Sequence, residues 1–210
     1  MQIKIDDFEK ILKCWKILYK LDDEIYLRIL REIQPDLNLN PEKTYAYIIR
    51  FLQIWGVRSA ANISPEHLCS KIQDLKPQLL QLNIDLLNAN LDSLNKQIRD
   101  VFDQIKAVRH VGPTSASKIL HILVPRLFVM WDVEIARNYR VSTDSQGYVE
   151  FLRKSQNLLM SLMRQYKSLG IAQPELELVN KYGKPLTKLL DEYNWLSIRI
   201  PVLKNIELMC

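Results

Sequence analysis

A glycine, a proline and a group of small hydroxyl residues stand together in the middle of the chain. Gly112 and Pro113 are followed by a threonine and two serines in the stretch GPTSASK. Proline suits the first position of a helix, because its missing N–H would be unpaired there. The backbone N–H groups of Thr114, Ser115 and Ala116 would then point outward from the positive end of that helix. Such a helix end is a binding site for phosphate.

Side chains of the same stretch add to this predicted phosphate site. Small side chains at Thr114, Ser115 and Ser117 allow a phosphate to approach and can donate hydroxyl hydrogen bonds, and Lys118 adds positive charge. Gly112 permits a backbone angle that other residues resist, so the chain can reverse there within about four residues. The alternative is an ordinary corner between two helices with glycine at its turn.

A carboxylate follows twenty residues after Gly112. Asp132 precedes the apolar stretch VEIA, which is the position of a helix N-cap. Breaking an N-glycosidic bond leaves positive charge on the sugar, and a carboxylate near the anomeric carbon stabilises that charge and orients water. Asp132 is therefore a candidate helix cap, a candidate catalytic group, or both.

A base must leave the DNA stack before its glycosidic bond can be attacked, and it then needs a pocket with stacking surfaces. Candidates for such a wall or wedge are Trp131, Trp55 and Phe128. The alternative for each of them is packing in the hydrophobic core.

The stretch VRHVGPTSASKI, with VMWD after it, resembles the helix–hairpin–helix superfamily of base-excision DNA glycosylases. The match is specific over about residues 105–140. It rests on two valines, a glycine, an alanine and an isoleucine at the motif's fixed positions: Val108, Val111, Gly112, Ala116 and Ile119. The resemblance implies an all-α, two-lobed helical domain over residues 1–210, with the hairpin at 105–123 and a candidate catalytic loop at 124–132.

The resemblance also implies how the parts act. The hairpin would grip the backbone of double-stranded DNA beside a flipped base, and Asp132 would face the target sugar. A monovalent cation is expected at the backbone carbonyls of Val108 and Val111, and no other cofactor, side-chain metal site or iron–sulfur cluster. The predicted phosphate-binding residues are Val111, Gly112, Thr114, Ser115, Ala116, Ser117 and Lys118.

Two positions depart from the family pattern. The turn has His110 where the family usually has glycine, and Thr114 stands where members with lyase activity carry lysine. Lys118 lies one helical turn later. The sequence therefore favours removal of the base by water over strand cleavage through a Schiff base.

The composition fits an intracellular protein that binds a polyanion. The chain has 210 residues, 48% of them hydrophobic, and a net charge of +5. The whole excess lies in residues 99–167, which carry 11 basic and 6 acidic side chains, although a chance fluctuation of a few charges is the alternative. The three cysteines Cys14, Cys69 and Cys210 fit neither a disulfide framework nor a metal-cluster spacing. With no secretory signal or membrane segment, we expect a cytoplasmic, nucleoid or nuclear protein.

Helical periodicity and caps predict about nine or ten helices and no strands. We expect Asp22, Asn40 and Ser64 to cap helices, Pro35 and Gly56 to end them, and Pro77 to break one. Further helices are predicted over residues 8–19, 91–106, 133–140, 147–169 and 184–195, with an extended tail from Trp195.

Three functions fit these observations. The first is a DNA glycosylase that hydrolyses the bond to a damaged or mismatched base. The second is a helix–hairpin–helix protein that binds DNA without chemistry. The third is a helical protein-interaction scaffold in which the Gly-Pro corner is structural.

Overall fold

The computed structural model describes residues 3–33 and 37–199, and within these ranges it contains helices and no β-strand. The all-α prediction is confirmed. None of the described helices is long and apolar enough to cross a membrane. The helices are α1 (Ile5–Leu18), α2 (Lys20–Ile33), α3 (Pro41–Lys43), α4 (Arg50–Ile54), α5 (Pro65–Gln81), α6 (Asn95–Lys106), α7 (Pro113–Leu123), α8 (Val133–Asn138), α9 (Ser145–Ser168), α10 (Pro174–Tyr182) and α11 (Leu186–Arg199), with a π-helical segment η1 (Thr44–Ile49) and 3₁₀ turns η2 (Arg58–Asn62) and η3 (Leu86–Asn88).

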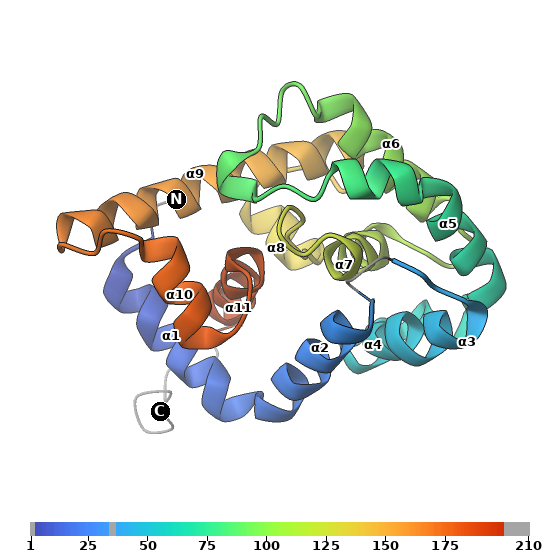
Figure 1. The fold of residues 1–210 in the computed structure, drawn as a ribbon, viewed down its shortest axis with the longest axis horizontal. Coiled ribbons are helices and arrows are strands. Elements are labelled where there is room, and N and C mark those ends of the chain that lie inside the picture. The colour runs from blue at the N-terminus through green and yellow to red at the C-terminus, as the bar shows by residue number, and fades with distance from the viewer. Residues whose placement is uncertain (1–2, 34–36, 200–210) are drawn as a thin grey trace.

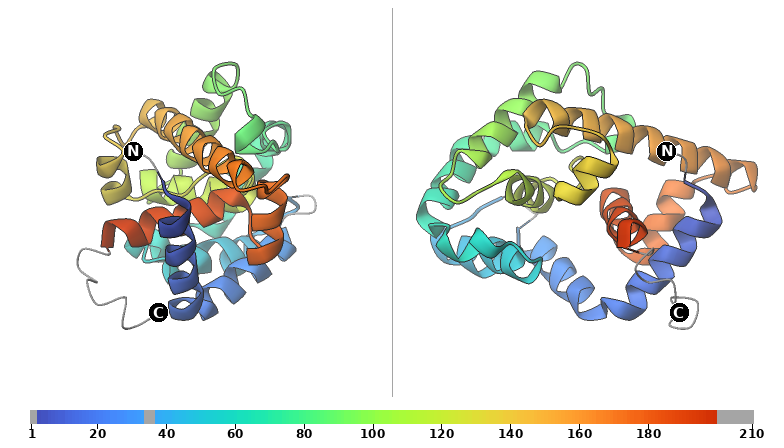
Figure 2. Two further views of the ribbon diagram at one scale, coloured as in Figure 1. Left: turned by 90° about the vertical axis from the view of Figure 1, so that its left-hand side faces the viewer. Right: turned by 180° about the vertical axis from the view of Figure 1, so that it is seen from behind.

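The helices form a ring of elements around α7 and α8. Helices α1, α10 and α11 lie at one end, and α3 to α6 lie at the other (Figure 1). Helix α9 runs along one long side and α2 along the opposite side, as the view from behind also shows (Figure 2). The first and last helices meet through aromatic pairs, with Phe8 5.6 Å from Tyr193 and Trp15 5.7 Å from Trp195 between ring centroids.

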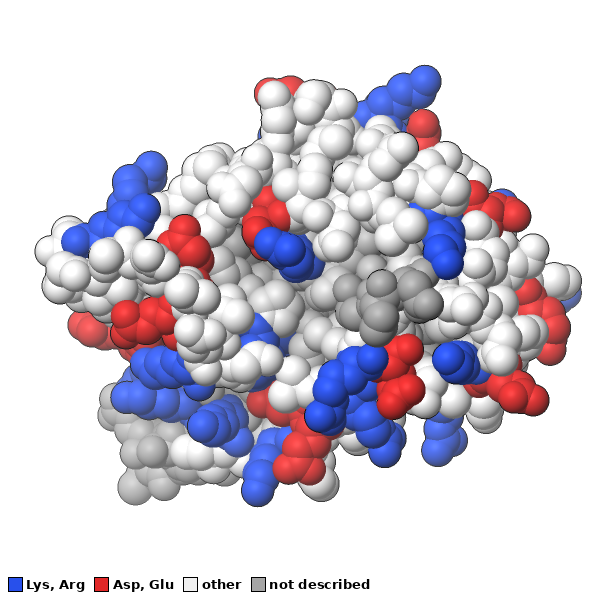
Figure 3. Space-filling view, viewed as in Figure 1, with Lys and Arg blue, Asp and Glu red and all other residues white. Residues whose placement is uncertain are grey.

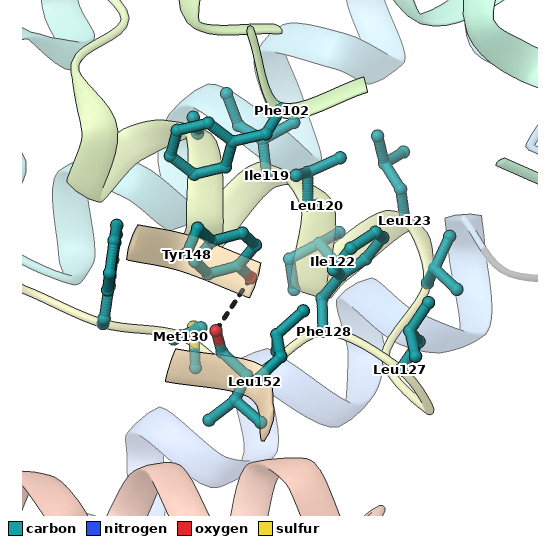
Figure 4. Close-up of a cluster of buried hydrophobic side chains, with 14 of the residues drawn as sticks. Phe102, Ile119, Leu120, Ile122, Leu123, Leu127, Phe128, Met130, Tyr148 and Leu152 are labelled. Atoms are coloured by element: carbon teal, nitrogen blue, oxygen red, sulfur yellow. Dashed lines mark hydrogen bonds between the residues drawn. The ribbon is translucent and has the colours of Figure 1, made fainter. Parts of the chain in front are cut away.

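Helix α7 is the centre of the hydrophobic core. Its residues Ile119, Leu120 and Ile122 are fully buried and pack with aromatic side chains from α6 and α9 (Figure 4). The hydroxyl of Tyr148 donates to the Val129 carbonyl at 2.9 Å, which ties α9 to the segment after α7. Because α7 is embedded on most of its faces, its N-terminus is held in a fixed position.

Several sequence predictions about helix ends are confirmed. Asn40 and Ser64 accept hydrogen bonds from amides three residues ahead, and Gly56 takes a left-handed conformation, φ +73°, after α4. Asp22 is not a cap, because α2 already begins at Lys20. Pro35 and Cys210 lie outside the described residues.

Two predicted boundaries are wrong. Pro77 does not end the helix, because α5 continues past it to Gln81. The burial of Leu75 and Leu79 on either side offsets the loss of the one hydrogen bond that proline removes. The tail after Trp195 is helical as far as Arg199, whose guanidinium stacks on the Trp195 ring at 4.0 Å. Helix α10 was not predicted.

A buried histidine makes the stability of this core depend on pH. The ring of His121 bonds the Tyr26 hydroxyl at 2.8 Å and the Phe128 carbonyl at 2.7 Å. Burial lowers the pKa of His121 from 6.5 to about 4. In the unfolded chain His121 therefore binds a proton below pH 6.5, whereas in the folded chain it binds one only below about pH 4.

We expect this histidine to cost about 3 kcal/mol of folding free energy as the pH falls from 6.5 to 4, with no such cost above 6.5. Urea unfolding of the wild type and of His121→Gln at several pH values measures it. The variant should lose less stability than the wild type over that interval. If the free energy of unfolding of the two proteins changed equally with pH, His121 would not be the cause of the pH dependence.

Candidate functional site

The predicted hairpin connects α6 to α7 through residues 107–112. The Val111 amide donates to the Val108 carbonyl at 3.0 Å, and the Ser59 hydroxyl donates to the His110 carbonyl at 2.9 Å. His110 takes the left-handed conformation, φ +70°, that glycine would take most easily. Gly112 instead has φ −91° and ψ 179°, an extended conformation open to any residue, so the prediction that Gly112 supplies the unusual angle is wrong. The residue before a proline is biased toward this conformation.

The start of α7 differs in part from the predicted phosphate site. Pro113 is the first helical residue, so the amides of Thr114 and Ser115 have no carbonyl one turn earlier in the helix to accept them. The Ala116 amide is already used, because it donates to the Gly112 carbonyl at 2.9 Å. Ser115 is itself only 2% exposed, so of the three predicted amides only that of Thr114 belongs to a residue that an anion can reach.

The serine hydroxyls do not serve a phosphate. Ser115 is 2% exposed and Ser117 is fully buried. The Ser117 hydroxyl donates to the Thr114 carbonyl at 2.9 Å, lies 3.3 Å from the Trp131 carbonyl and accepts the Trp131 amide at 3.2 Å. Its hydroxyl instead fixes the segment that leads to Asp132 against the start of α7. The prediction that Ser117 contacts phosphate is wrong for this reason.

Asp132 is the N-cap of α8 and also lines a cavity. Its Oδ1 accepts the Ile135 amide at 2.8 Å, and its Oδ2 accepts from Arg199 at 3.2 Å. Arg199 also pairs with Glu134 at 3.1 Å. The carboxylate is about one quarter exposed, so solvent and ligands can reach it.

The cavity has a volume of about 400 Å³ and lies between the start of α7 and the ends of α1, α4 and α11. The predicted residues Thr114, Lys118, Asp132, Trp55 and Trp131 all contribute to it. The described residues that line it are Trp15, Tyr19, Asp22, Ile54, Trp55, Gly56, Thr114, Lys118, Trp131, Asp132, Ile135, Asp191, Trp195 and Arg199.

One predicted wall residue lies elsewhere, and another is mostly in the core. Phe128 is fully buried beside Tyr148, within the cluster of Figure 4, so its prediction as a pocket or wedge residue is wrong. Trp131 is only 1% exposed. Its ring nitrogen donates to the Pro113 carbonyl at 3.2 Å, and one part of it reaches the cavity. Trp55 is half-buried and faces the cavity more openly.

Lys118 points into the cavity and not toward the outer face of the hairpin. Its amine donates to the Trp55 carbonyl at 2.6 Å. Burial lowers the pKa of this amine, and the nearby carboxylates of Asp191 and Asp132 offset only part of that effect. The prediction that Lys118 contacts a phosphate at the hairpin therefore does not fit its position.

Six of the fourteen described residues that line the cavity come from the segment of α1 and α2 and from α11, and sequence reasoning missed them. Trp195 and Arg199 follow Asp191 at intervals of four, which places all three on one face of a helix. This spacing was the available signal, but an extended tail was expected there instead. The missed residues are Trp15, Tyr19, Asp22, Asp191, Trp195 and Arg199.

A fully buried lysine supports the cavity from behind. The Lys188 ammonium lies 4.5 Å from the centroid of the Trp15 ring and 5.9 Å from that of Trp55. It bonds Asp191 at 2.9 Å and lies 3.3 Å from Glu192. Burial alone would lower the pKa of Lys188, but these two carboxylates raise it. Lys188 therefore stays charged, and its ion pair holds the Asp191 side chain at the cavity surface.

The basic surplus of residues 99–167 is partly neutralised on the surface. Arg126 forms an ion pair with Asp85, and Arg153 pairs with Asp92 at 2.6 Å. Both acids come from outside the basic segment. Lysines and arginines alternate with acids on the face shown in Figure 3. A continuous basic surface is therefore not a feature of that face.

Comparison with protein-family models, curated proteins and solved structures finds no match for this chain. Among the described residues, no group of three or more His, Cys, Asp or Glu side chains could hold a metal ion. The cation predicted at the carbonyls of Val108 and Val111 stays a prediction, and the Val108 carbonyl already accepts one amide within the turn.

Proposed function

We propose that this protein binds duplex DNA through the hairpin at residues 107–113 and hydrolyses the N-glycosidic bond of a damaged or mismatched base. The observation that carries the proposal is that Thr114, at the start of α7, and the Asp132 carboxylate line the same aromatic cavity of about 400 Å³. An anion site, a carboxylate and stacking surfaces are the three parts that excision of a flipped base requires.

The DNA backbone would contact the hairpin beside the cavity. The amide of Thr114, which is not buried, lies at the positive end of α7. Two exposed arginines stand close by: Arg109 lies in the turn, and Arg58 precedes the Ser59 that bonds the turn. A phosphate held by these groups would leave the attached nucleotide at the mouth of the cavity.

The flipped base would enter between aromatic side chains. Trp55 and Trp195 supply flat surfaces for stacking, which contributes about 1–3 kcal/mol per base where it has been measured. Asp191, which pairs with Lys188 at 2.9 Å, accepts hydrogen bonds from the base. Asp132 stabilises the positive sugar as the bond breaks and orients the attacking water.

The test is an assay of base release. Duplexes that carry uracil, an alkylated base, an oxidised base or a mismatch are incubated with the protein, and the free base is measured. Release of at least one base at a rate above that of the protein-free reaction supports the proposal. Absence of release from every duplex refutes the catalytic part.

A second candidate is a DNA-binding protein without chemistry. It is favoured by the engagement of both Asp132 oxygens, one in capping α8 and the other in the ion pair with Arg199. This function predicts salt-dependent binding to duplex DNA without base release.

A charge placed on the hairpin tests DNA binding in both cases. Thr114→Glu adds a negative charge at the second position of α7 and should weaken binding to undamaged duplex DNA about tenfold at low salt, because it repels the phosphate. Gln146→Glu is the matched control, since Gln146 is the exposed second residue of α9. Fluorescence anisotropy measures the dissociation constants. Equal affinities for the two variants would remove the hairpin from the interface.

A further inference from the structure

A second cavity, with a volume of about 540 Å³, lies where α2, α9, α10 and the start of α11 meet. The face in Figure 3 is hollowed near its centre, where these elements come together. Ligand sites in proteins commonly have volumes of about 300–1,000 Å³. None of the described residues lines both this cavity and the cavity at Asp132, so the second cavity is a separate candidate site.

The walls of the second cavity are aliphatic. Seven of the described residues that line it are leucine or valine, two are proline, and none is aromatic. Leu86 from η3 and Leu159 from α9 are buried at this cavity. A nucleobase needs flat surfaces for stacking, and these walls offer none. They suit a flexible aliphatic chain, which binds about fourfold more tightly for each CH₂ group that leaves water.

Polar groups around the second cavity are already bonded to one another. Arg126 Nε donates to Asp85 at 2.7 Å, the Leu86 amide donates to the Arg126 carbonyl at 2.9 Å, and the Thr187 hydroxyl donates to the Pro125 carbonyl. Among the described residues, no buried side-chain atom that lacks a hydrogen-bond partner belongs to this lining. The cavity is therefore preformed, and its interior has no polar group waiting for a ligand.

The charged side chains that line the second cavity carry no net charge. Arg126 pairs with Asp85, and the Lys184 ammonium bonds two carboxylates outside the lining at 2.7 Å each. With Glu175, the described lining residues supply two cations and two anions. Arg126 and Glu175 are exposed and mark the mouth. A ligand would therefore place its apolar chain inside the cavity and its polar head in water at this mouth.

The surface around the mouth favours a small molecule over a protein partner. Leu176 is the one large hydrophobic side chain that is exposed among the described residues lining the second cavity. A protein partner would need a wider apolar patch at the centre of its interface. One exposed leucine at the edge of an aliphatic cavity instead matches a site that encloses a single chain.

We propose that the second cavity binds the unbranched aliphatic chain of a fatty acid or a fatty alcohol. This inference goes beyond excision of a base, and it does not depend on the proposed function because the two cavities are lined by different residues. Failure of base release would leave it standing, and its own failure would leave the glycosylase proposal standing.

The test is isothermal titration calorimetry of the full-length protein with octanoate, decanoate and dodecanoate, each below the concentration at which it forms micelles. We expect one site per chain, and a dissociation constant that falls roughly 15-fold from octanoate to decanoate, since two CH₂ groups are added. Titration with 1-octanol distinguishes the two ligand sources: a fatty acid site prefers octanoate, and a fatty alcohol site prefers octanol. Absence of binding by all four compounds, or affinities that do not change with chain length, would overturn the inference.

Two variants locate the bound chain. Leu176→Glu places a charge at the mouth and should weaken decanoate binding at least tenfold, because the charge would have to lose water beside the chain. Leu80→Glu is the matched control: Leu80 is 49% exposed on α5, Leu176 is 52% exposed on α10, and only Leu176 lines the cavity. Val179→Trp fills the cavity from α10, in case the glutamate turns into solvent.

Circular dichroism and thermal melting show that each variant is folded. Wild-type affinity in Leu80→Glu, together with loss of affinity in folded Leu176→Glu or Val179→Trp, supports the site. Wild-type affinity in folded Leu176→Glu and Val179→Trp, or an equal loss in Leu80→Glu, would mean that the chain binds elsewhere and would refute the proposal.

Discussion

Replacing Asp132 by asparagine is expected to reduce the rate of base release about 100- to 1,000-fold. In the proposed function the Asp132 carboxylate stabilises the positively charged sugar, and asparagine removes its negative charge while keeping the shape. Asparagine is also a good N-cap, so the bond to the Ile135 amide and the start of α8 should survive. Single-turnover measurement of the released base on the best duplex found in the screen gives the two rates.

The control is a second aspartate that also caps the N-terminus of a helix. Asp144 caps α9 by accepting the Gly147 amide at 2.8 Å, and it does not line the cavity. Asp144→Asn should therefore release base at the wild-type rate. If the two variants were equally slow, Asp132 would owe its effect to capping. If Asp132→Asn released base as fast as the wild type, the Asp132 carboxylate would have no role in catalysis.

Replacing Lys188 by methionine is expected to lower the free energy of unfolding by about 3–5 kcal/mol. Lys188 is fully buried and is paired with Asp191 and Glu192. Its removal leaves Asp191 without its cation and Trp15 without the ammonium over its ring, while Glu192 keeps its bond to Lys184 at 2.7 Å. Urea unfolding followed by circular dichroism measures the loss.

An exposed lysine on the same part of the molecule provides the comparison. Lys181 pairs with Glu9 at 2.5 Å but is 46% exposed, so Lys181→Met should cost about 1 kcal/mol or less. A similar loss for both variants would mean that the buried ion pairs at Lys188 contribute no more than a surface pair.

The sequence predicted most of the helices and part of the candidate site. Local signals sufficed where the cause was local: Asn40 and Ser64 are caps because their side chains bond amides three residues ahead. The proximity of Asp132 to the start of α7 followed from a motif in which both elements lie within a short stretch of chain. These predictions needed no knowledge of long-range packing.

The rest of the cavity depends on contacts that a local pattern does not contain. Trp15 and Trp195 are 180 positions apart in the chain, yet their rings are 5.7 Å apart. The direction of the Lys118 side chain is set by the carbonyl of Trp55, the residue that follows α4. Phe128 and Trp131 are both almost fully buried, yet only Trp131 lies at the cavity, and the sequence around them carries no sign of this difference.

The contribution of α1 and α11 to one cavity has a consequence for biosynthesis. The hairpin and Asp132 emerge from the ribosome well before Asp191, Trp195 and Arg199. The nascent chain therefore carries the start of α7 before it has a walled cavity. That cavity is complete only after residues up to Arg199 have been synthesised and α11 has docked.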